Sequence, residues 1–369
     1  MRPQTLVCYI SGHGFGHAVR VLEVLRALRI RRPQCALHIR TTVPRWFIDT
    51  GLSGPFTYTR VQLDVGAVQR DSLTLDPLAT LQAYAELAAH KQQIIAAAVH
   101  SLEPLRPTLV FADIPALAFD IARQLDVPGI AMANFSWDWI YADYVRDLPA
   151  YQLVVDGLHA SYAYATELLR LPFHGDLSAF PRRRDIPLVA RRAVLSPADA
   201  RQRLGLPPHE RIVLLSFGGI GVELTTAPTA PRGVTFVATQ SAGHGATLPA
   251  NCRLISNTDL AARRVRYEDL VAAADVVMTK PGYGIVADCI ANGTAMIYTP
   301  RGRFAEYACL VRGIAAHLPH AFISNDDLHG GRWSDALDAV FAQPRRPAEM
   351  DISGAAVAAE ILDDRLLSC

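Results

Sequence analysis

The stretch that decides the fold of this chain is residues 280–288, which read KPGYGIVAD. An apolar, valine-containing run at 275–278 (DVVM) precedes it, and a second apolar run at 295–298 (AMIY) follows it. A strand, a glycine-rich corner, a helix and another strand make one βαβ crossover. Glycines let the backbone approach a ligand closely, and the N–H groups at the start of the helix attract an anion. The corner therefore predicts either a phosphate cradle or a structural turn that only redirects the chain.

Asp288 lies one turn into the helix of this crossover, where its carboxylate could accept hydrogen bonds from sugar hydroxyls. A phosphate cradle with a carboxylate beside it suggests a nucleotide or nucleotide-sugar pocket. The first glycine-rich loop, SGHGFGH at 11–17, does not fit a dinucleotide fingerprint, because His17 stands at the third glycine position and residues 40–42 (RTT) supply no acid for a ribose. NAD and FAD are therefore disfavoured, and no Walker A motif occurs in the chain.

Strands and helices alternate along the whole chain, which predicts an α/β protein with two doubly wound, mainly parallel sheets facing each other across a cleft. Between the strands we expect helices, including a long one over about 78–103 and a helical stretch near 146–170. The apolar runs that read as strands lie at 6–10, 36–39, 108–112, 129–132, 212–216, 234–237, 252–255, 275–278 and 295–298.

The length of 369 residues favours two domains. The chain becomes irregular and basic through 180–187, so we place the boundary there, with an N-terminal domain at 1–187 and a C-terminal domain at 188–369. The last helical segment, at about 352–367, could pack back onto the first domain.

Composition excludes several classes of function. Lys and Arg total 36 against 35 for Asp and Glu, so no net field favours nucleic acid or an anionic membrane. The six cysteines show no C-x-x-C spacing, no D-x-D pair ends a strand, and no His/Cys cluster has ligand spacing, so we expect neither disulfides nor a bound catalytic metal. Without a signal-peptide pattern or an apolar run of the ~18 residues that a spanning helix needs, the sequence predicts a cytoplasmic protein with no transmembrane segment; it does not indicate the oligomeric state.

The loop at 11–17 directly follows the first strand and carries His13 and His17 at the mouth of the expected cleft. A histidine can take a proton near neutral pH, as a general base must. Asp113 ends the strand at 108–112 on the same edge of the same sheet, where it could orient the imidazole. The alternative is that His17 and Asp113 merely cap helices. These residues alone do not decide which histidine is the base.

Taken together, the loop, the two α/β halves and the crossover resemble the GT-B glycosyltransferases. The closest resemblance is to the glycosyltransferase-like N-terminal half of plant L-arabinokinases and its free-standing bacterial relatives; the N-acetylglucosaminyltransferase of peptidoglycan lipid synthesis is more distant. The resemblance spans about residues 10–325, and no kinase motif accompanies it. The matching segments are 9–17, 64–66 with Gln69, 71–72, 136–141, 280–288 and 301–307.

The resemblance implies a nucleotide-sugar donor site in the second domain. Asp288 would bind the ribose, backbone near 267–270 the base, Glu306 the hydroxyls of the donor sugar, and Arg301 or Arg303 a phosphate. The residues implied to hold the diphosphate are Ser216, Gly218, Gly219, Lys280, Gly282, Tyr283 and Gly284.

In the first domain the resemblance places His17 at the position of the general base of inverting relatives and Asp113 at that of its orienting partner. Asp71, Asn134, Trp137 and Asp138 would face the acceptor, although tryptophans at 137 and 139 are as typical of a packed core.

The implied function is an inverting, metal-independent transfer of a sugar from a nucleoside diphosphate sugar, with UDP favoured, to a soluble acceptor. No cofactor is expected beyond that co-substrate. A nucleotide-sugar hydrolase, a 2-epimerase and a non-catalytic nucleotide-sugar-binding module remain open alternatives, as do the identities of the sugar, the base and the acceptor.

Overall fold

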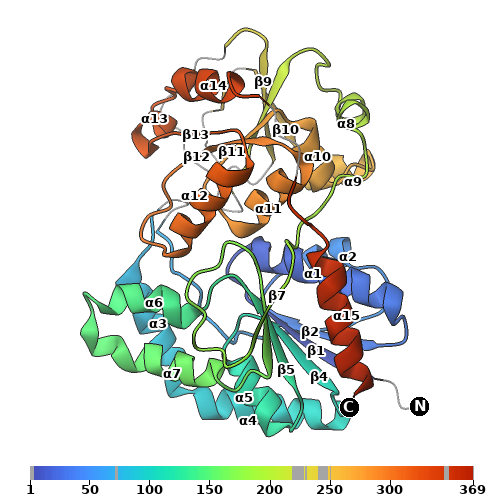
Figure 1. Cartoon of the computed structure of the whole chain (residues 1–369), viewed down its shortest axis with the longest axis vertical. Coiled ribbons are helices and arrows are strands. Elements are labelled where there is room, and N and C mark those ends of the chain that lie inside the picture. The colour runs from blue at the N-terminus through green and yellow to red at the C-terminus, as the bar shows by residue number, and fades with distance from the viewer. Residues whose placement is uncertain are drawn as a thin grey trace.

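The computed structural model describes residues 4–70, 74–217, 228, 231–239, 248–249, 251–344 and 349–368. Within these residues the chain forms two parallel sheets, one above the other in Figure 1, each flanked by helices. The two doubly wound α/β halves expected from the alternation of strands and helices are therefore confirmed. The division into domains at residue 187 stays a prediction.

The first sheet has seven strands in the order β3-β2-β1-β4-β5-β6-β7. Reading outward from the central strand β1, the order reverses direction between β1 and β4, and at such a point the loops beyond the carboxyl ends of the strands open a crevice for a ligand. The strands are β1 (Thr5–Ile10), β2 (Ala36–Thr41), β3 (Thr57–Arg60), β4 (Leu109–Asp113), β5 (Gly129–Ala133), β6 (Glu167–Arg170) and β7 (Arg183–Asp185).

The second sheet has six strands in the order β10-β9-β8-β11-β12-β13, and its direction reverses between β8 and β11. In both sheets the strand order thus reverses beside the first strand of that sheet, β1 or β8. Figure 1 shows the two halves stacked one above the other. The strands are β8 (Arg211–Leu215), β9 (Val234–Thr239), β10 (Cys252–Ile255), β11 (Val276–Thr279), β12 (Ala295–Tyr298) and β13 (His320–Phe322).

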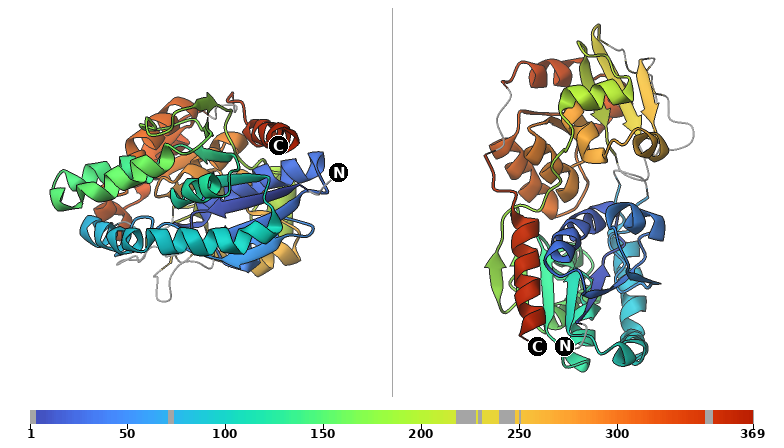
Figure 2. Two further views of the ribbon diagram at one scale, coloured as in Figure 1. Left: turned by 90° about the horizontal axis from the view of Figure 1, so that it is seen from below. Right: turned by 90° about the vertical axis from the view of Figure 1, so that its right-hand side faces the viewer.

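Helices cover both faces of each sheet (Figures 1 and 2). Those of the lower half are α1 (Phe15–Arg31), α2 (Arg45–Gly51), α3 (Pro77–Ala89), α4 (Lys91–Leu102), α5 (Leu117–Gln124), α6 (Trp137–Val145), α7 (Gln152–Tyr162) and α15 (Gly354–Leu367). Those of the upper half are α8 (Pro197–Leu204), α9 (Asn257–Ala262), α10 (Tyr267–Ala273), α11 (Tyr283–Asn292), α12 (Glu306–His317), α13 (Asn325–His329) and α14 (Ser334–Phe341).

Two expected helices are corrected by the structure. The run at 78–103 is two helices that break at His90, because α3 packs against α6 and α7 whereas α4 packs against α5. The helical stretch near 146–170 ends at Tyr162, and the chain re-enters the first sheet as β6, whose backbone pairs with β5.

The last helix, α15, lies against α1 of the first half (Figure 2). Arg32, directly after α1, forms an ion pair with Asp363 of α15. Arg365 of α15 donates to Glu167 Oε2 of β6 at 3.2 Å. The chain therefore passes between the halves twice, and the two passages are hydrogen-bonded: Leu188 N–H donates to Asp351 O at 3.0 Å, and Gly354 N–H to Leu188 O at 3.2 Å.

The apolar core follows from this arrangement. One cluster of buried side chains covers one face of each sheet and is continuous from the first half into the second through α1, α11 and α15. Separate clusters fill the other face of each sheet. The strands read as almost unbroken apolar runs because parallel strands covered on both faces bury every side chain.

Candidate active site

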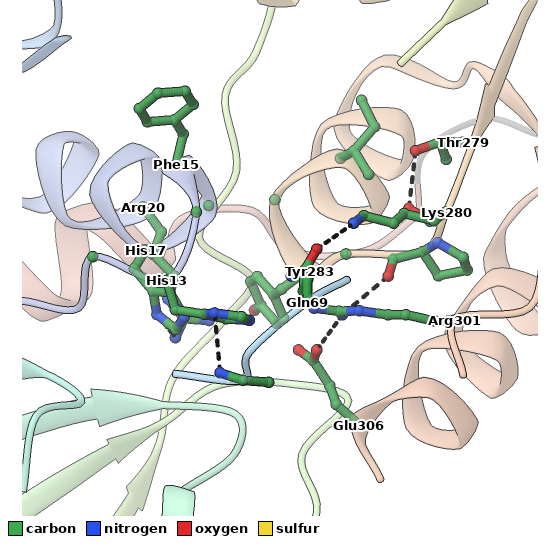
Figure 3. Close-up of a pocket in the computed structure, with 18 of the residues that line it drawn as sticks. His13, Phe15, His17, Arg20, Gln69, Thr279, Lys280, Tyr283, Arg301 and Glu306 are labelled. Atoms are coloured by element: carbon green, nitrogen blue, oxygen red, sulfur yellow. Dashed lines mark hydrogen bonds and ion pairs between the residues drawn. The ribbon is translucent and has the colours of Figure 1, made fainter. Parts of the chain in front are cut away.

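A cavity of about 710 Å³ lies between the two halves, at the carboxyl ends of their central strands. Figure 3 shows side chains from both halves pointing into it. The first half contributes Gly12, His13, Gly14, Phe15, Gly16, His17, Arg20, Thr42, Val43, Pro44, Val65, Ala67, Gln69 and Phe135. The second contributes Ser216, Phe217, Thr279, Lys280, Pro281, Gly282, Tyr283, Gly284, Ile285, Arg301 and Glu306.

The glycine-rich corner forms one wall of this cavity. Strand β11 ends at Thr279 and α11 begins at Tyr283, with Gly282 at the N-cap. The start of α11 lines the cavity, and among the described residues no side chain caps it, so its first N–H groups and the positive end of its dipole are available to a ligand there. Lys280, one of two lysines in the chain, donates from Nζ to Gln69 Oε1 at 3.3 Å. An anion would find both partial and full positive charge at this corner.

The start of α1 lies opposite the start of α11. Gly14, at the N-cap of α1, has a φ of 79°, and no side chain within the described ranges caps this helix either. A Cβ placed on Gly284 would lie only 3.6 Å from Gly16 Cα. Two helix N-termini, one from each half, therefore meet at the same cavity.

Of the other residues expected at the diphosphate, Ser216 lines the cavity and its Oγ lies 2.6 Å from Tyr267 Oη. Gly218 and Gly219 lie outside the described residues. Asp71, expected to face the acceptor, also lies outside them.

His17 and Asp113 meet at the cavity. His17 is 6% exposed, and its Nδ1 lies 2.9 Å from Asp113 Oδ1. Burial alone would raise the pKa of the Asp113 carboxyl, but the Arg20 charge and His17 outweigh it and hold that pKa below its usual range. The ionised carboxylate only accepts, so Nδ1–H is the donor, and a neutral His17 ring would carry its lone pair on Nε2. This is the tautomer that a general base needs.

Arg20 takes part in this pair but was not predicted from the sequence. It lies one turn after His17 on α1 and is buried. Its Nε donates to Asp113 Oδ2 and its Nη2 to Asp113 Oδ1 at 2.6 Å. The same guanidinium donates from Nη1 to Asn134 Oδ1 at 2.7 Å. Arg20 therefore fixes the Asp113 carboxylate in both position and charge.

Asn134 and Glu306 carry this network into the second half. Asn134 Nδ2 donates to Glu306 Oε1 at 2.7 Å. Arg301 Nη1 donates to Glu306 Oε2 at 2.7 Å and to Pro281 O at 3.0 Å (Figure 3). The full series of contacts runs through His17, Asp113, Arg20, Asn134, Glu306 and Arg301.

Arg303 lies apart from the cavity lining described here. It is exposed, and its Nε donates to Asp143 Oδ2 at 2.6 Å while Nη1 pairs with Asp147. These contacts join the two halves at the surface, and a role of Arg303 toward a phosphate stays a prediction.

Asp288, expected at the ribose, is 1% exposed and is not among the residues that line this cavity. Its carboxylate accepts from the Arg191 backbone N–H at 3.0 Å and from Arg191 Nε at 3.1 Å. Asp288 thus anchors the segment that leads from the first half to the second, and its role toward a ribose stays a prediction.

His13 lines the cavity but is unsuited to accept a proton. Its Nδ1 accepts a hydrogen bond from the Ala67 N–H at 3.2 Å, so the ring proton lies on Nε2. Burial lowers the pKa of His13 to about 3, and the charges of Arg301, His17 and Lys280 act in the same direction. His13 is therefore neutral, and its ring is held by packing against Trp137 and Phe304.

Trp137 and Asp138 are not among the residues that line this cavity. Trp137 is fully buried, stacks on Tyr141 and donates from Nε1 to Asp64 Oδ2 at 3.0 Å. Asp138 lies 3.2 Å from His159 Nδ1. These contacts are typical of a packed core, and a role of Trp137 or Asp138 toward an acceptor stays a prediction.

An aromatic cluster lies at the rim of the first half and was also missed from the sequence. Phe15 lines the cavity and stacks on Phe47 with 4.4 Å between ring centroids, and the half-exposed Trp46 packs beside both. Phe15 belongs to α1, whereas Trp46 and Phe47 belong to α2. The packing of these two helices brings the three rings together.

Within the described part of the chain, no cluster of three or more His, Cys, Asp or Glu side chains could hold a metal ion. Among the same residues, no helix is both long enough and apolar enough to cross a lipid bilayer.

The architecture is the GT-B fold of glycosyltransferases. It matches the crystal structure of the kitacinnamycin glycosyltransferase with a TM-score of 0.62 and 17% identity, covering 99% of this chain and 100% of that one. It also matches the spinosyn rhamnosyltransferase SpnG complexed with thymidine diphosphate, with a TM-score of 0.59, 14% identity and 99% and 96% coverage. A third match is the Phytolacca americana UGT2 complexed with UDP-2fluoro-glucose and pterostilbene, with a TM-score of 0.56, 13% identity and 99% and 94% coverage.

The chain is also similar in sequence to the L-arabinokinase of Arabidopsis thaliana, with 30% identity over 364 residues. That match covers 96% of this chain and 34% of the relative, so the chain spans about a third of the relative's length. No family model matches the chain. The resemblance inferred from the motifs, to GT-B glycosyltransferases and to arabinokinases, is confirmed by these matches.

Proposed function

We propose that this protein is an inverting glycosyltransferase that moves a sugar from a nucleoside diphosphate sugar to a hydroxyl of an acceptor. One observation carries the proposal: the His17–Asp113 pair and the uncapped start of α11 with Lys280 line the same cavity from opposite halves. The first arrangement suits a general base, and the second suits a diphosphate leaving group.

In the proposed reaction, His17 Nε2 takes the proton of the acceptor hydroxyl as its oxygen attacks the anomeric carbon. The bond from that carbon to the diphosphate oxygen breaks, and its electron pair leaves with the nucleoside diphosphate. Because attack and departure occur on opposite faces of the sugar, the configuration inverts. Asp113 stabilises the imidazolium that forms, as it is already the acceptor of the Nδ1 proton.

The departing diphosphate gains negative charge, which the dipole of α11 and the ammonium of Lys280 would stabilise. We propose on this basis that the reaction needs no metal. The structural neighbours complexed with thymidine diphosphate and UDP-2fluoro-glucose support a nucleoside diphosphate donor, and the resemblance favours UDP. A soluble acceptor and a cytoplasmic location complete the proposal and stay predictions.

The first test is a calorimetric titration with nucleoside diphosphates and their sugars. We expect one nucleotide to bind and Lys280→Ala to weaken it by about tenfold or more, since a charge-assisted contact is lost. Lys91→Ala is the matched control, because Lys91 is the other lysine and does not line the cavity. His17→Ala should leave nucleotide affinity nearly unchanged and abolish turnover.

Labelled donor then separates the alternatives. Transfer requires an acceptor, hydrolysis gives free sugar, epimerisation gives an altered nucleotide sugar, and a binding module gives no product. Binding without any turnover across a broad acceptor panel, with His17→Ala behaving as wild type, would contradict the catalytic role given to His17.

A further inference from the structure

Tyr283 is the first residue of α11, yet its side chain reaches across the cavity to the other half of the molecule. Side chains on a helix lean toward its N-terminus, and here that direction leads into the cavity. The Arg20 guanidinium lies over the Tyr283 ring at 4.9 Å from its centroid. Figure 3 shows the ring between His17 and His13 on one side and Lys280 and Arg301 on the other.

The hydroxyl of Tyr283 has no hydrogen-bond partner among the residues that the structure describes, although the residue is only 6% exposed and lines the cavity. Buried hydroxyls are normally hydrogen-bonded, so this one needs an explanation. Burial raises the pKa of Tyr283 well above its usual value, which outweighs the lowering effect of Arg20. The hydroxyl therefore keeps its proton and is available as a donor.

The position of this hydroxyl in the site restricts its partner. The hydroxyl is at the far end of the Tyr283 ring from the start of α11, whose backbone N–H groups are proposed to hold the diphosphate. There its charged neighbours are Arg20, Asp113 and Glu306. These three residues belong to the network that holds His17, the proposed general base. A ligand group that reaches the Tyr283 hydroxyl would therefore lie between the diphosphate and His17.

We infer that the Tyr283 hydroxyl donates a hydrogen bond to an oxygen of the transferred sugar, and so helps to select and orient that sugar. The inference rests on the proposed function, because the transferred sugar is the part of the donor that would lie between the diphosphate and His17, the proposed general base. A sugar oxygen would then supply the hydrogen-bond partner that this buried hydroxyl lacks among the described residues.

Tyr283→Phe tests this with the ring and its contact with Arg20 retained. We expect the variant to bind the sugar nucleotide about 3- to 10-fold more weakly, which is the loss of one neutral hydrogen bond. Its affinity for the nucleoside diphosphate without the sugar should change less than twofold. Because the substitution removes a buried hydroxyl without a partner, the melting temperature of the ligand-free variant should equal or exceed that of the wild type.

Tyr9→Phe is the matched control. The Tyr9 hydroxyl is also buried and without a partner among the described residues, and its ring also packs against an arginine, Arg40, at 5.8 Å. Tyr9 does not line the cavity, so both affinities should stay at the wild-type value.

Three outcomes would overturn the inference. Equal loss of affinity for the sugar nucleotide and the bare diphosphate would place the contact on the diphosphate. No loss for either, or a lowered melting temperature of the ligand-free variant, would make the hydroxyl structural. If the wild type binds neither ligand class, the proposed function fails and the inference fails with it, a result that the wild-type titration alone identifies.

Discussion

The amide of Asn134 donates a 2.7 Å hydrogen bond to the carboxylate of Glu306, although 172 residues separate them along the chain. Asn134 follows β5 of the first half, and Glu306 begins α12 of the second. Because Asn134 also accepts from Arg20, a single side chain connects the charged groups of both halves. The geometry of the proposed base in one half is thus tied to the position of the other half.

Removing this connection should destabilise the protein. Asn134→Ala leaves Arg20 and Glu306 each without one buried partner, and we expect the free energy of unfolding in urea to fall by about 2–3 kcal/mol. Asn257→Ala, at an exposed position of α9, should change it by less than about 0.5 kcal/mol. Equal effects of the two substitutions would show that the Asn134 contacts contribute nothing to stability.

Asp113 should make stability depend on pH in acid. Its pKa is lowered in the folded state, so its stabilising contribution is complete above the unfolded pKa of about 3.8 and is lost as the pH falls through the lower folded value. At neutral pH, Asp113→Asn should cost about 3–5 kcal/mol, because Arg20 is left buried without its anion. Urea unfolding between pH 3 and 7 checks this: the gap between variant and wild type should narrow toward pH 3, and a constant gap would contradict it.

His13 should remain neutral across the physiological range. Its folded pKa of about 3 lies below the ordinary 6.5, so the unfolded chain binds a proton at His13 that the folded chain does not, and stability falls as the pH drops from 6.5 toward 3. In NMR spectra, the His13 imidazole signals should not titrate between pH 5 and 8. His13→Gln identifies those signals, and a midpoint near 6.5 would disprove the burial argument.

Gly66 should not tolerate a side chain. Its φ is +74°, and a Cβ there would lie 2.4 Å from His13 Nδ1. Gly66→Ala should therefore lower the free energy of unfolding by about 2 kcal/mol or more. Gly157→Ala offers the opposite result, because that glycine lies within α7 with open space around it, and alanine should stabilise the helix by up to about 1 kcal/mol. Thermal unfolding of both variants would reveal the difference in sign.

The fold and the central pair of the site were accessible from the sequence because they depend on strand order and chain direction. His17 follows β1 and Asp113 ends β4, and in a parallel sheet neighbouring strands end at the same edge; the pairing of Ile10 with Asp113 brings this about. The glycine-rich corner at residues 280–284 could also be predicted from the sequence, because it is formed by consecutive residues.

Contacts between residues that lie far apart in the sequence could not be predicted. Arg20 lies among apolar residues of α1, and only the folded chain reveals that it meets Asp113 and Asn134. Asp288 had the spacing of a ribose ligand, but Arg191, 97 residues earlier, binds its carboxylate. No local pattern in a sequence indicates which charged side chain of a distant segment will reach a given helix face.

The two passages between the halves, at 186–190 and 349–354, run beside each other and share backbone hydrogen bonds. Cleavage of either passage would leave the two halves associated, because the uncut passage and the packing of α15 on α1 would still hold them. A protease nick in either passage would thus create new chain ends without separating the two halves.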